Sequence, residues 1–174
     1  MKKIILVPLI SGVMAMSASV FAVDAGKGTV TFTGSIISAP CSIAPGEENQ
    51  TIELGQVSNV TLEAGGESTP QPFSIQLQGC NLAEDNQVTV VFGGTAADAT
   101  GLLSIVGEAQ GAGVKIMTTA GTQIKAGDGS TGSKQNYVKG DNELKFQAAL
   151  KGLTGATVVP GDFTATTNFT LSYQ

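Results

Sequence analysis

Two cysteines carry the most reactive side chains of this chain. Cys41 and Cys80 are the only cysteines, and the 174-residue sequence contains no histidine. Two thiols can close a disulfide, whereas two thiols without histidine make a poor ligand set for a metal ion. The absence of histidine also removes the commonest general acid and base, which excludes His-dependent triads and His-ligated zinc sites.

Adjacent acidic residues, Glu47–Glu48 and Glu84–Asp85, are the other candidates for chemistry. General acid–base catalysis needs two carboxylates that face each other across a cleft with separated pKa values. Neighbouring residues on a strand or turn point apart, so we expect solvated loops at both positions. Gly93–Gly94 is a turn element, because no Lys-Ser/Thr follows it as in a phosphate-binding loop. The sequence therefore predicts neither an enzyme nor a bound cofactor or metal.

The N-terminus predicts export. Two lysines precede an apolar stretch at residues 4–16, and a branched and a small residue, Val20 and Ala22, occupy the −3 and −1 positions of a cleavage site. This is the layout of a secretory signal peptide. The apolar run is shorter than the roughly 20 residues of a spanning helix, which disfavours a membrane anchor. We expect residues 1–22 to be removed, and cleavage after Ala25 is the alternative.

Export determines what the cysteines and the surface charge imply. An oxidising compartment favours a Cys41–Cys80 disulfide, and closing a loop of about 40 residues stabilises by roughly 3–4 kcal/mol. Without the signal, 174 − 22 = 152 residues remain, which suits one domain. The signal takes two of the nine basic residues, so the net charge becomes 7 − 14 = −7. Such a surface disfavours nucleic-acid binding and membrane insertion.

The exported chain has the pattern of an all-β sandwich. Segments rich in Thr, Val and Gly alternate between turn residues, and no stretch beyond the signal keeps a helical period. The spacing corresponds to about eight strands in one domain. Residues 126–135 are predicted to be a polar loop. Strand character is found at residues 28–36, 41–43, 51–57, 73–78, 88–92, 102–106, 114–118, 123–125, 144–149 and 161–174.

The best alternation lies at the two ends of the exported chain. In residues 28–36, Val30, Phe32 and Ile36 share one face, and in residues 161–174 the odd-numbered positions form an apolar face. Terminal segments are normally the least tightly patterned parts of a domain. Either both ends pair inside their own domain, or one of them adds a strand to an open sheet edge of another molecule. The pattern alone leaves both interpretations open.

Several motifs occur in a fixed order along the chain. They are Gly28-x-Val30-x-Phe32-x-Gly34-x-Ile36, Ala39-Pro40-Cys41-Ser42-Ile43, Leu54-Gly55-Gln56-Val57, Phe73-x-Ile75-x-Leu77 before Cys80, Gly113-Val114-Lys115-Ile116 with Gly121 and Ile124 after it, and Gly161-Asp162-Phe163 to Leu171-Ser172-Tyr173-Gln174. Together they resemble the major pilins of chaperone–usher fimbriae, similar to those of P pili and mannose-resistant Proteus-like fimbriae. The resemblance covers essentially the whole exported chain.

The resemblance implies a fold and a set of site residues. The fold is an incomplete immunoglobulin-like sandwich, residues 38–174, that lacks its final strand, preceded by a donor-strand extension, residues 23–37. The donor residues that would fill the groove of a neighbouring copy are Gly28, Val30, Phe32, Gly34 and Ile36. The C-terminal strand would border this groove and contact a chaperone through Gly161, Phe163, Phe169, Leu171, Tyr173 and Gln174.

The function implied by the resemblance is structural. The chain would be a shaft subunit of a fimbrium on the bacterial surface, exported through the periplasm and polymerised by donor-strand exchange. Its partners would be copies of itself, a periplasmic chaperone and an outer-membrane usher. The alternative is a minor adaptor or adhesive subunit, although a tip adhesin usually carries a further N-terminal domain. A third class, a periplasmic enzyme such as a copper–zinc dismutase, needs histidine ligands that this chain lacks.

Overall fold

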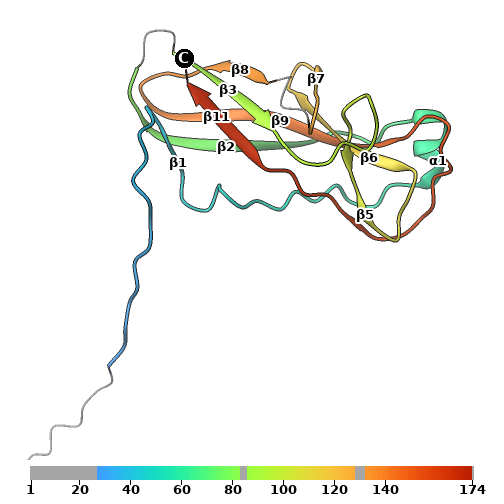
Figure 1. Ribbon diagram of the computed structural model, residues 1–174, viewed down its shortest axis with the longest axis horizontal. Helices are drawn as coiled ribbons and strands as arrows, with labels where there is room; N and C mark the ends of the chain where they lie inside the picture. Colours follow the sequence, from blue (N-terminus) through green and yellow to red (C-terminus); the bar gives the residue numbers. More distant parts are fainter. Residues whose placement is uncertain (1–26, 83–85, 128–131, 174) are drawn as a thin grey trace, which may run out of the picture. The chain divides into compact units, whose positions relative to one another are not determined.

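The computed structural model describes residues 27–82, 86–127 and 132–173 (Figure 1). The predicted signal peptide, residues 23–26 of the predicted extension, Glu84–Asp85 and Gln174 lie outside these ranges. The chain divides into two units, Met1–Ser35 and Ile36–Gln174. The second unit is built mainly of antiparallel strands, which confirms the predicted all-β fold.

The larger sheet runs through the centre of the second unit. Its antiparallel order is β1 (Ser42–Ile43), β2 (Gln71–Cys80), β9 (Gly140–Gly152), β6 (Ala112–Thr118) and β4 (Leu103–Ser104), with β7 (Gln123–Ile124) also beside β6. The long strands β2 and β9 pair from Gln71↔Ala148 to Cys80↔Gly140. Their register brings alternating apolar residues of both strands to one inner face.

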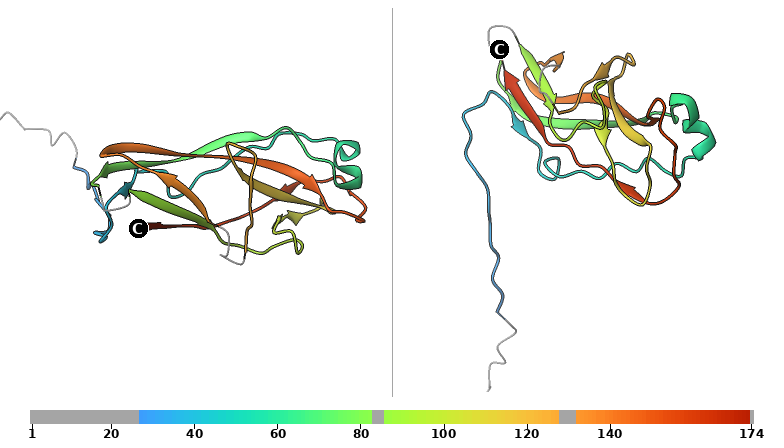
Figure 2. Two further views of the ribbon diagram at one scale, coloured as in Figure 1. Left: turned by 90° about the horizontal axis from the view of Figure 1, so that it is seen from above. Right: turned by 45° about the vertical axis from the view of Figure 1, so that its right-hand side comes forward.

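A second layer covers that inner face. Three strands form one sheet in the order β11 (Phe169–Tyr173), β3 (Gln87–Phe92) and β8 (Ser133–Asn136), and β10 (Phe163–Thr164) pairs with β5 (Val106–Gly107). The short helix α1 (Asn59–Leu62) and a 3₁₀ turn (Glu63–Gly65) lie at the end of the domain opposite to β1 and the end of β11 (Figure 2). We call the end with Cys41 and Tyr173 the base, and the end with α1 the tip.

Three phenylalanines join the two layers at the middle of the domain. The Phe73 and Phe146 rings stack with centroids 5.5 Å apart, and Phe92 meets Phe146 edge-on at 5.1 Å. Phe92 and Phe146 are almost fully buried. Phe73 is half-buried and packs against both apolar clusters of the core, one toward the base and one toward the tip. The trio therefore connects the two halves of the core.

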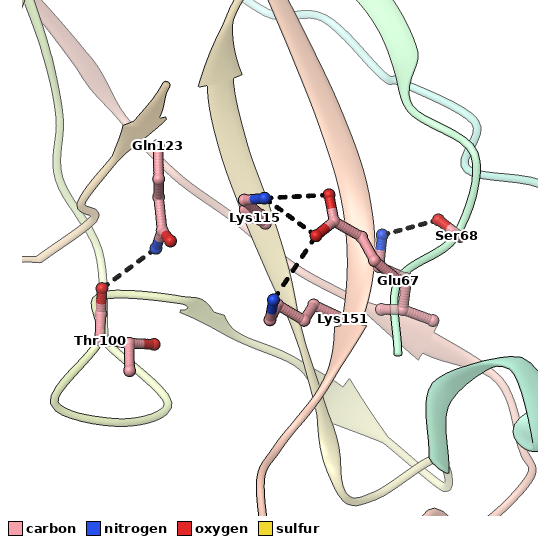
Figure 3. Close-up of polar contacts among 7 residues, drawn as sticks. Glu67, Ser68, Thr100, Lys115, Gln123 and Lys151 are labelled. Atoms are coloured by element: carbon pink, nitrogen blue, oxygen red, sulfur yellow. Dashed lines mark hydrogen bonds and ion pairs between the residues drawn. The ribbon is translucent and has the colours of Figure 1, made fainter. Parts of the chain in front are cut away.

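Covalent and polar contacts hold the segments that flank this core. Cys41 and Cys80 form the predicted disulfide, which ties the start of β1 to the end of β2. Near the tip, the Glu67 carboxylate accepts hydrogen bonds from Lys115 Nζ at 2.9 and 3.1 Å and lies 3.5 Å from Lys151 Nζ (Figure 3). Ser68, which is buried, exchanges hydrogen bonds with the backbone of Leu150. Residues 67–68 are thus fixed to β9.

The predicted strands were confirmed where they find a partner within the domain. Residues 73–78 and 88–92 lie in β2 and β3, and residues 114–118 and 123–124 form the β6–β7 hairpin. The strand prediction was wrong for residues 51–57, which form no strand because their backbone meets no partner among the described residues. Residues 28–36 form no strand within the described chain, and their role as a donated strand stays a prediction. The loop prediction for residues 126–135 missed the start of β8.

Replacement of Phe146 by alanine should separate the two halves of the core. Loss of a buried phenylalanine side chain typically costs about 3–5 kcal/mol of unfolding free energy. We expect Phe146→Ala to lower the free energy of unfolding by that amount in urea titrations. Phe32→Ala is the matched control, because Phe32 is 89% exposed and its loss should leave the curve unchanged. Equal effects of the two substitutions would contradict this assignment of the core.

Candidate functional site

The C-terminal segment covers the core on one side only. Its odd-numbered residues from Phe163 to Tyr173 are half-buried and its even-numbered residues are exposed, which is the predicted alternation. β11 pairs with β3 in the register Phe169↔Phe92 to Tyr173↔Val88, but it is the outermost strand of its sheet. The paired residues of β3 that face the core are fully buried. The half-burial along β11 therefore marks an edge at which the core is incompletely covered.

The second incomplete edge is the segment at residues 51–57, which follows β1. Among the residues that the structure describes, its backbone makes no hydrogen bond with another segment. Leu54 and Val57 nevertheless rest half-buried on the tip cluster, which Phe163 and Ala165 also contact. Buried or half-buried backbone groups are normally paired, so an extended segment without a ladder partner is unusual. Two unpaired edges thus adjoin one apolar cluster.

The C-terminal segment changes partner between its two strands. β10 pairs with β5, and β11 pairs with β3, so the predicted continuous strand at residues 161–174 is two strands. The Gly93 N–H donates to the Asn168 carbonyl at 2.7 Å, and Thr167 Oγ1 donates to the Gly93 carbonyl at 2.5 Å. A Cβ on Gly93 would lie 2.4 Å from Asn168 Oδ1. Glycine at this position permits the crossing between the two sheets.

Gly161 begins the C-terminal segment where it passes close to another loop. A Cβ there would lie 2.6 Å from Glu108 Cβ and 2.7 Å from the Ala109 nitrogen. The Asp162 carbonyl accepts hydrogen bonds from the Glu108 and Ala109 N–H groups at 2.9 and 3.2 Å. The close approach leaves no room for a side chain.

The predicted donor residues lie in the described N-terminal segment, and their large apolar side chains are exposed. Val30 is 75% exposed, Phe32 is 89% exposed and Ile36 is fully exposed. Gly28 and Gly34 have no atom within 4 Å of an added Cβ. Three large apolar side chains on one face of an extended segment are costly in water and typical of a binding segment. The role of this segment as a donor strand stays a prediction.

Sequence reasoning missed Phe73 and Tyr137 as parts of the site. Phe73 supports the tip cluster between the two edges, and Tyr137 packs edge-on against Tyr173 with ring centroids 5.8 Å apart. Tyr137 is buried, and its hydroxyl finds no hydrogen-bond partner among the residues that the structure describes. It lies between β8 and β9, in a region whose polar sequence gives no sign of a buried aromatic contact. Only the spacing of Phe73 within its alternating strand could have indicated an inward side chain.

The Glu47 and Glu48 carboxylates lie in a loop, as predicted, and accept hydrogen bonds there. Glu47 Oε2 accepts hydrogen bonds from Gln50 Nε2 at 2.8 Å and from the Gln76 N–H at 3.3 Å, and Glu48 accepts from the Gly46 N–H at 3.0 Å. Within the described ranges, no group of three His, Cys, Asp or Glu side chains is arranged to hold a metal ion. No helix in that part of the chain is long and apolar enough to cross a membrane.

Tyr173 should give the edge a pH dependence. Partial burial raises the pKa of its phenol above 10, and the neighbouring Tyr137 adds to the rise. A pKa that is higher in the folded state stabilises the fold below the unfolded pKa, and this stability is lost as the pH rises through the folded pKa. We expect the free energy of unfolding to fall above about pH 10, and less steeply in Tyr173→Phe. An identical alkaline slope in both proteins would contradict this role of Tyr173.

Comparisons with known proteins agree with this geometry. The chain is 49% identical over 155 residues to Fimbria A protein of Serratia marcescens, covering 88% of each chain. It is 44% identical over 165 residues to the Major MR/P fimbria protein of Proteus mirabilis, covering 94% of this chain and 93% of that one.

Solved structures show the same fold. A chaperone–usher pilus structure matches with a TM-score of 0.78 at 32% identity, covering 88% of this chain and 99% of that one. The crystal structure of the P pilus rod subunit PapA matches with a TM-score of 0.69 at 33% identity, covering 78% and 100%. The family described as Fimbrial protein matches residues 30–174. The chain, with its uncompleted β-sandwich and its exposed apolar N-terminal segment, belongs to the Fimbrial protein family.

Proposed function

We propose that this protein is the structural shaft subunit of a surface fimbrium and is completed by the N-terminal segment of the next copy. The observation that carries the proposal is the pair of unpaired edges, residues 51–57 and the C-terminal strand, on one half-covered core. An added strand between them would satisfy both backbones and cover the half-buried side chains. A structural role rather than a catalytic one accounts for this arrangement.

The N-terminal segment has the chemistry of such a strand. Nine residues, 28–36, span about 30 Å when extended. Val30, Phe32 and Ile36 would each contribute about 1.5–3 kcal/mol on full burial. Their side chains are exposed, so this free energy is available to an added contact. The segment therefore supplies what the two edges lack.

An open fibre sets the direction of the donated strand. The extension of each copy joins its domain at the base, beside Cys41. If it entered a neighbour at the base, two copies could exchange extensions and close a dimer. Entry at the tip leaves each base free to donate again, which produces a filament. The donated strand then runs antiparallel to the C-terminal strand, with Ile36 at the tip.

Side-chain sizes favour one antiparallel register. Residues directly opposite in an antiparallel pair share a face and contact each other. One alignment places every large donor residue opposite a small acceptor residue, and each donor glycine opposite a phenylalanine. The pairs are Ile36 with Gly161, Gly34 with Phe163, Phe32 with Ala165, Val30 with Thr167, and Gly28 with Phe169. Glycine at position 34 then makes room for the Phe163 ring.

The same surfaces explain why a chaperone and an usher would be needed. Before assembly, the apolar edges of the sandwich and the exposed extension would be prone to aggregation. A periplasmic chaperone that covers the C-terminal edge, and an outer-membrane usher at which the strands exchange, meet this need. The shaft role accords with relatives named as major fimbrial proteins and rod subunits. A minor adaptor of the same fibre is the alternative, and subunit copy number per fibre separates the two.

A donor peptide tests the proposal directly. A chain of residues 38–174 should be markedly stabilised by a peptide of residues 24–37, because the peptide fills both edges. Phe32→Asp or Ile36→Asp in the peptide should abolish the rise in melting temperature. Thr33→Asp is the control, since its side chain lies on the opposite face of the strand. A truncated chain that is equally stable without peptide would show that no strand is missing.

The register has its own test. Ala165→Phe should weaken binding of the natural peptide by at least about tenfold, because two phenylalanines would overlap in one position. The peptide with Phe32→Ala should restore binding to this variant. The peptide with Val30→Ala should not restore it. Rescue by Val30→Ala instead would assign a different register.

A further inference from the structure

The exposed apolar side chains of the second unit are concentrated at its two ends. Large apolar residues are usually buried, so their clustering on the surface indicates contact with another molecule. Beyond residue 36, one group lies at the base, one at the tip, and a single residue on the 51–57 edge. The base has Ile37, Leu82 and Val138, the tip has Val60, Val106 and Val159, and the edge has Ile52.

The base group is built around the end of the β2–β9 pair. Leu82 follows Cys80 by two positions and Val138 precedes Gly140 by two, so both lie just beyond the last pair of the β2–β9 ladder, Cys80↔Gly140. They are 57% and 64% exposed. The Asn81 N–H donates to the Pro40 carbonyl at 2.8 Å, which attaches the chain just after Ile37 to the same place.

The tip group lies on α1 and the loops beside it. α1 buries Leu62 and turns Val60 outward, where it is 68% exposed. Val159, which is 41% exposed, is held by two backbone hydrogen bonds with Gln110 at 3.0 and 3.1 Å. A shallow hollow of about 420 Å³ opens beside Val106 and is also lined by Leu153. The tip thus offers apolar surface with a concave part.

We propose that the base of one copy docks on the tip of the next through these apolar groups, in addition to the donated strand. The inference rests on the proposed function. If Ile36 lies opposite Gly161 at the tip, the five residues to Cys41 span at most about 17 Å, so the donor's base must lie close to the acceptor's tip. The occupant of each apolar end is therefore a second copy of this chain.

Directional pairing of full-length chains tests the contact. The acceptor chain carries Phe32→Asp, so it can receive a strand but donates its own extension poorly. It is mixed in excess with a donor chain that has the natural extension, and the complex of the two is isolated. Leu82→Asp with Val138→Asp should shorten the half-life of this complex about tenfold when placed on the donor, and leave it unchanged when placed on the acceptor. Val60→Asp with Val159→Asp should show the reverse. Ala120→Asp, in the exposed β6–β7 turn, is the control on both chains.

The outcomes separate the two proposals. Each variant is also tested for stabilisation by the peptide of residues 24–37, and a normal response shows that it is folded and accepts a strand. If the variants at the base and at the tip respond normally to the peptide and their complexes have unchanged half-lives, the proposed contact between base and tip is overturned. The proposed donor strand is then unaffected. Effects that do not depend on which chain carries the substitution also overturn it. If the peptide stabilises no chain, both proposals fail.

Discussion

The fold depends on one constraint, which is that the backbone groups at the edge of a buried sheet need partners. The second unit meets this constraint along β2, β9, β6 and β3 and leaves it unmet along residues 51–57 and the outer side of β11. Around this gap the odd-numbered residues of the C-terminal strand stay half-buried. The rest of the domain is organised to hold these two edges in place while they are unpaired.

Several contacts hold the two unpaired edges in place. The disulfide fixes the start of β1, the strand that precedes residues 51–57. The three phenylalanines connect the base and tip halves of the core. Glycines 93 and 161 let the C-terminal segment cross closely over other backbones, so one segment borders the gap along its whole length. A preformed edge loses little conformational entropy when a strand is added.

The sequence predicted most of what pairs inside the domain. Alternation identified β2, β3 and the β6–β7 hairpin, because each buries one face. It could not identify β8, because Ser133–Asn136 joins β3 through backbone hydrogen bonds and only Ser133 is buried. Residues 28–36 and 51–57 have strand patterns without strand partners, and pattern alone does not say which molecule supplies the partner. The apolar ends were also beyond prediction, since only the fold shows that Leu82 and Val138 both lie just beyond the last β2–β9 pair.

Hydrogen exchange compared between the isolated chain and assembled fibres tests the central claim most directly. Within the described ranges, the amides of residues 51–57 have no backbone partner, so they should exchange rapidly in the isolated chain. In fibres they should become strongly protected together with those of residues 28–36, while amides of β2 and β9 remain protected in both states. Rapid exchange of residues 51–57 in fibres, or their full protection in the isolated chain, would contradict the account of a fold completed by its neighbour.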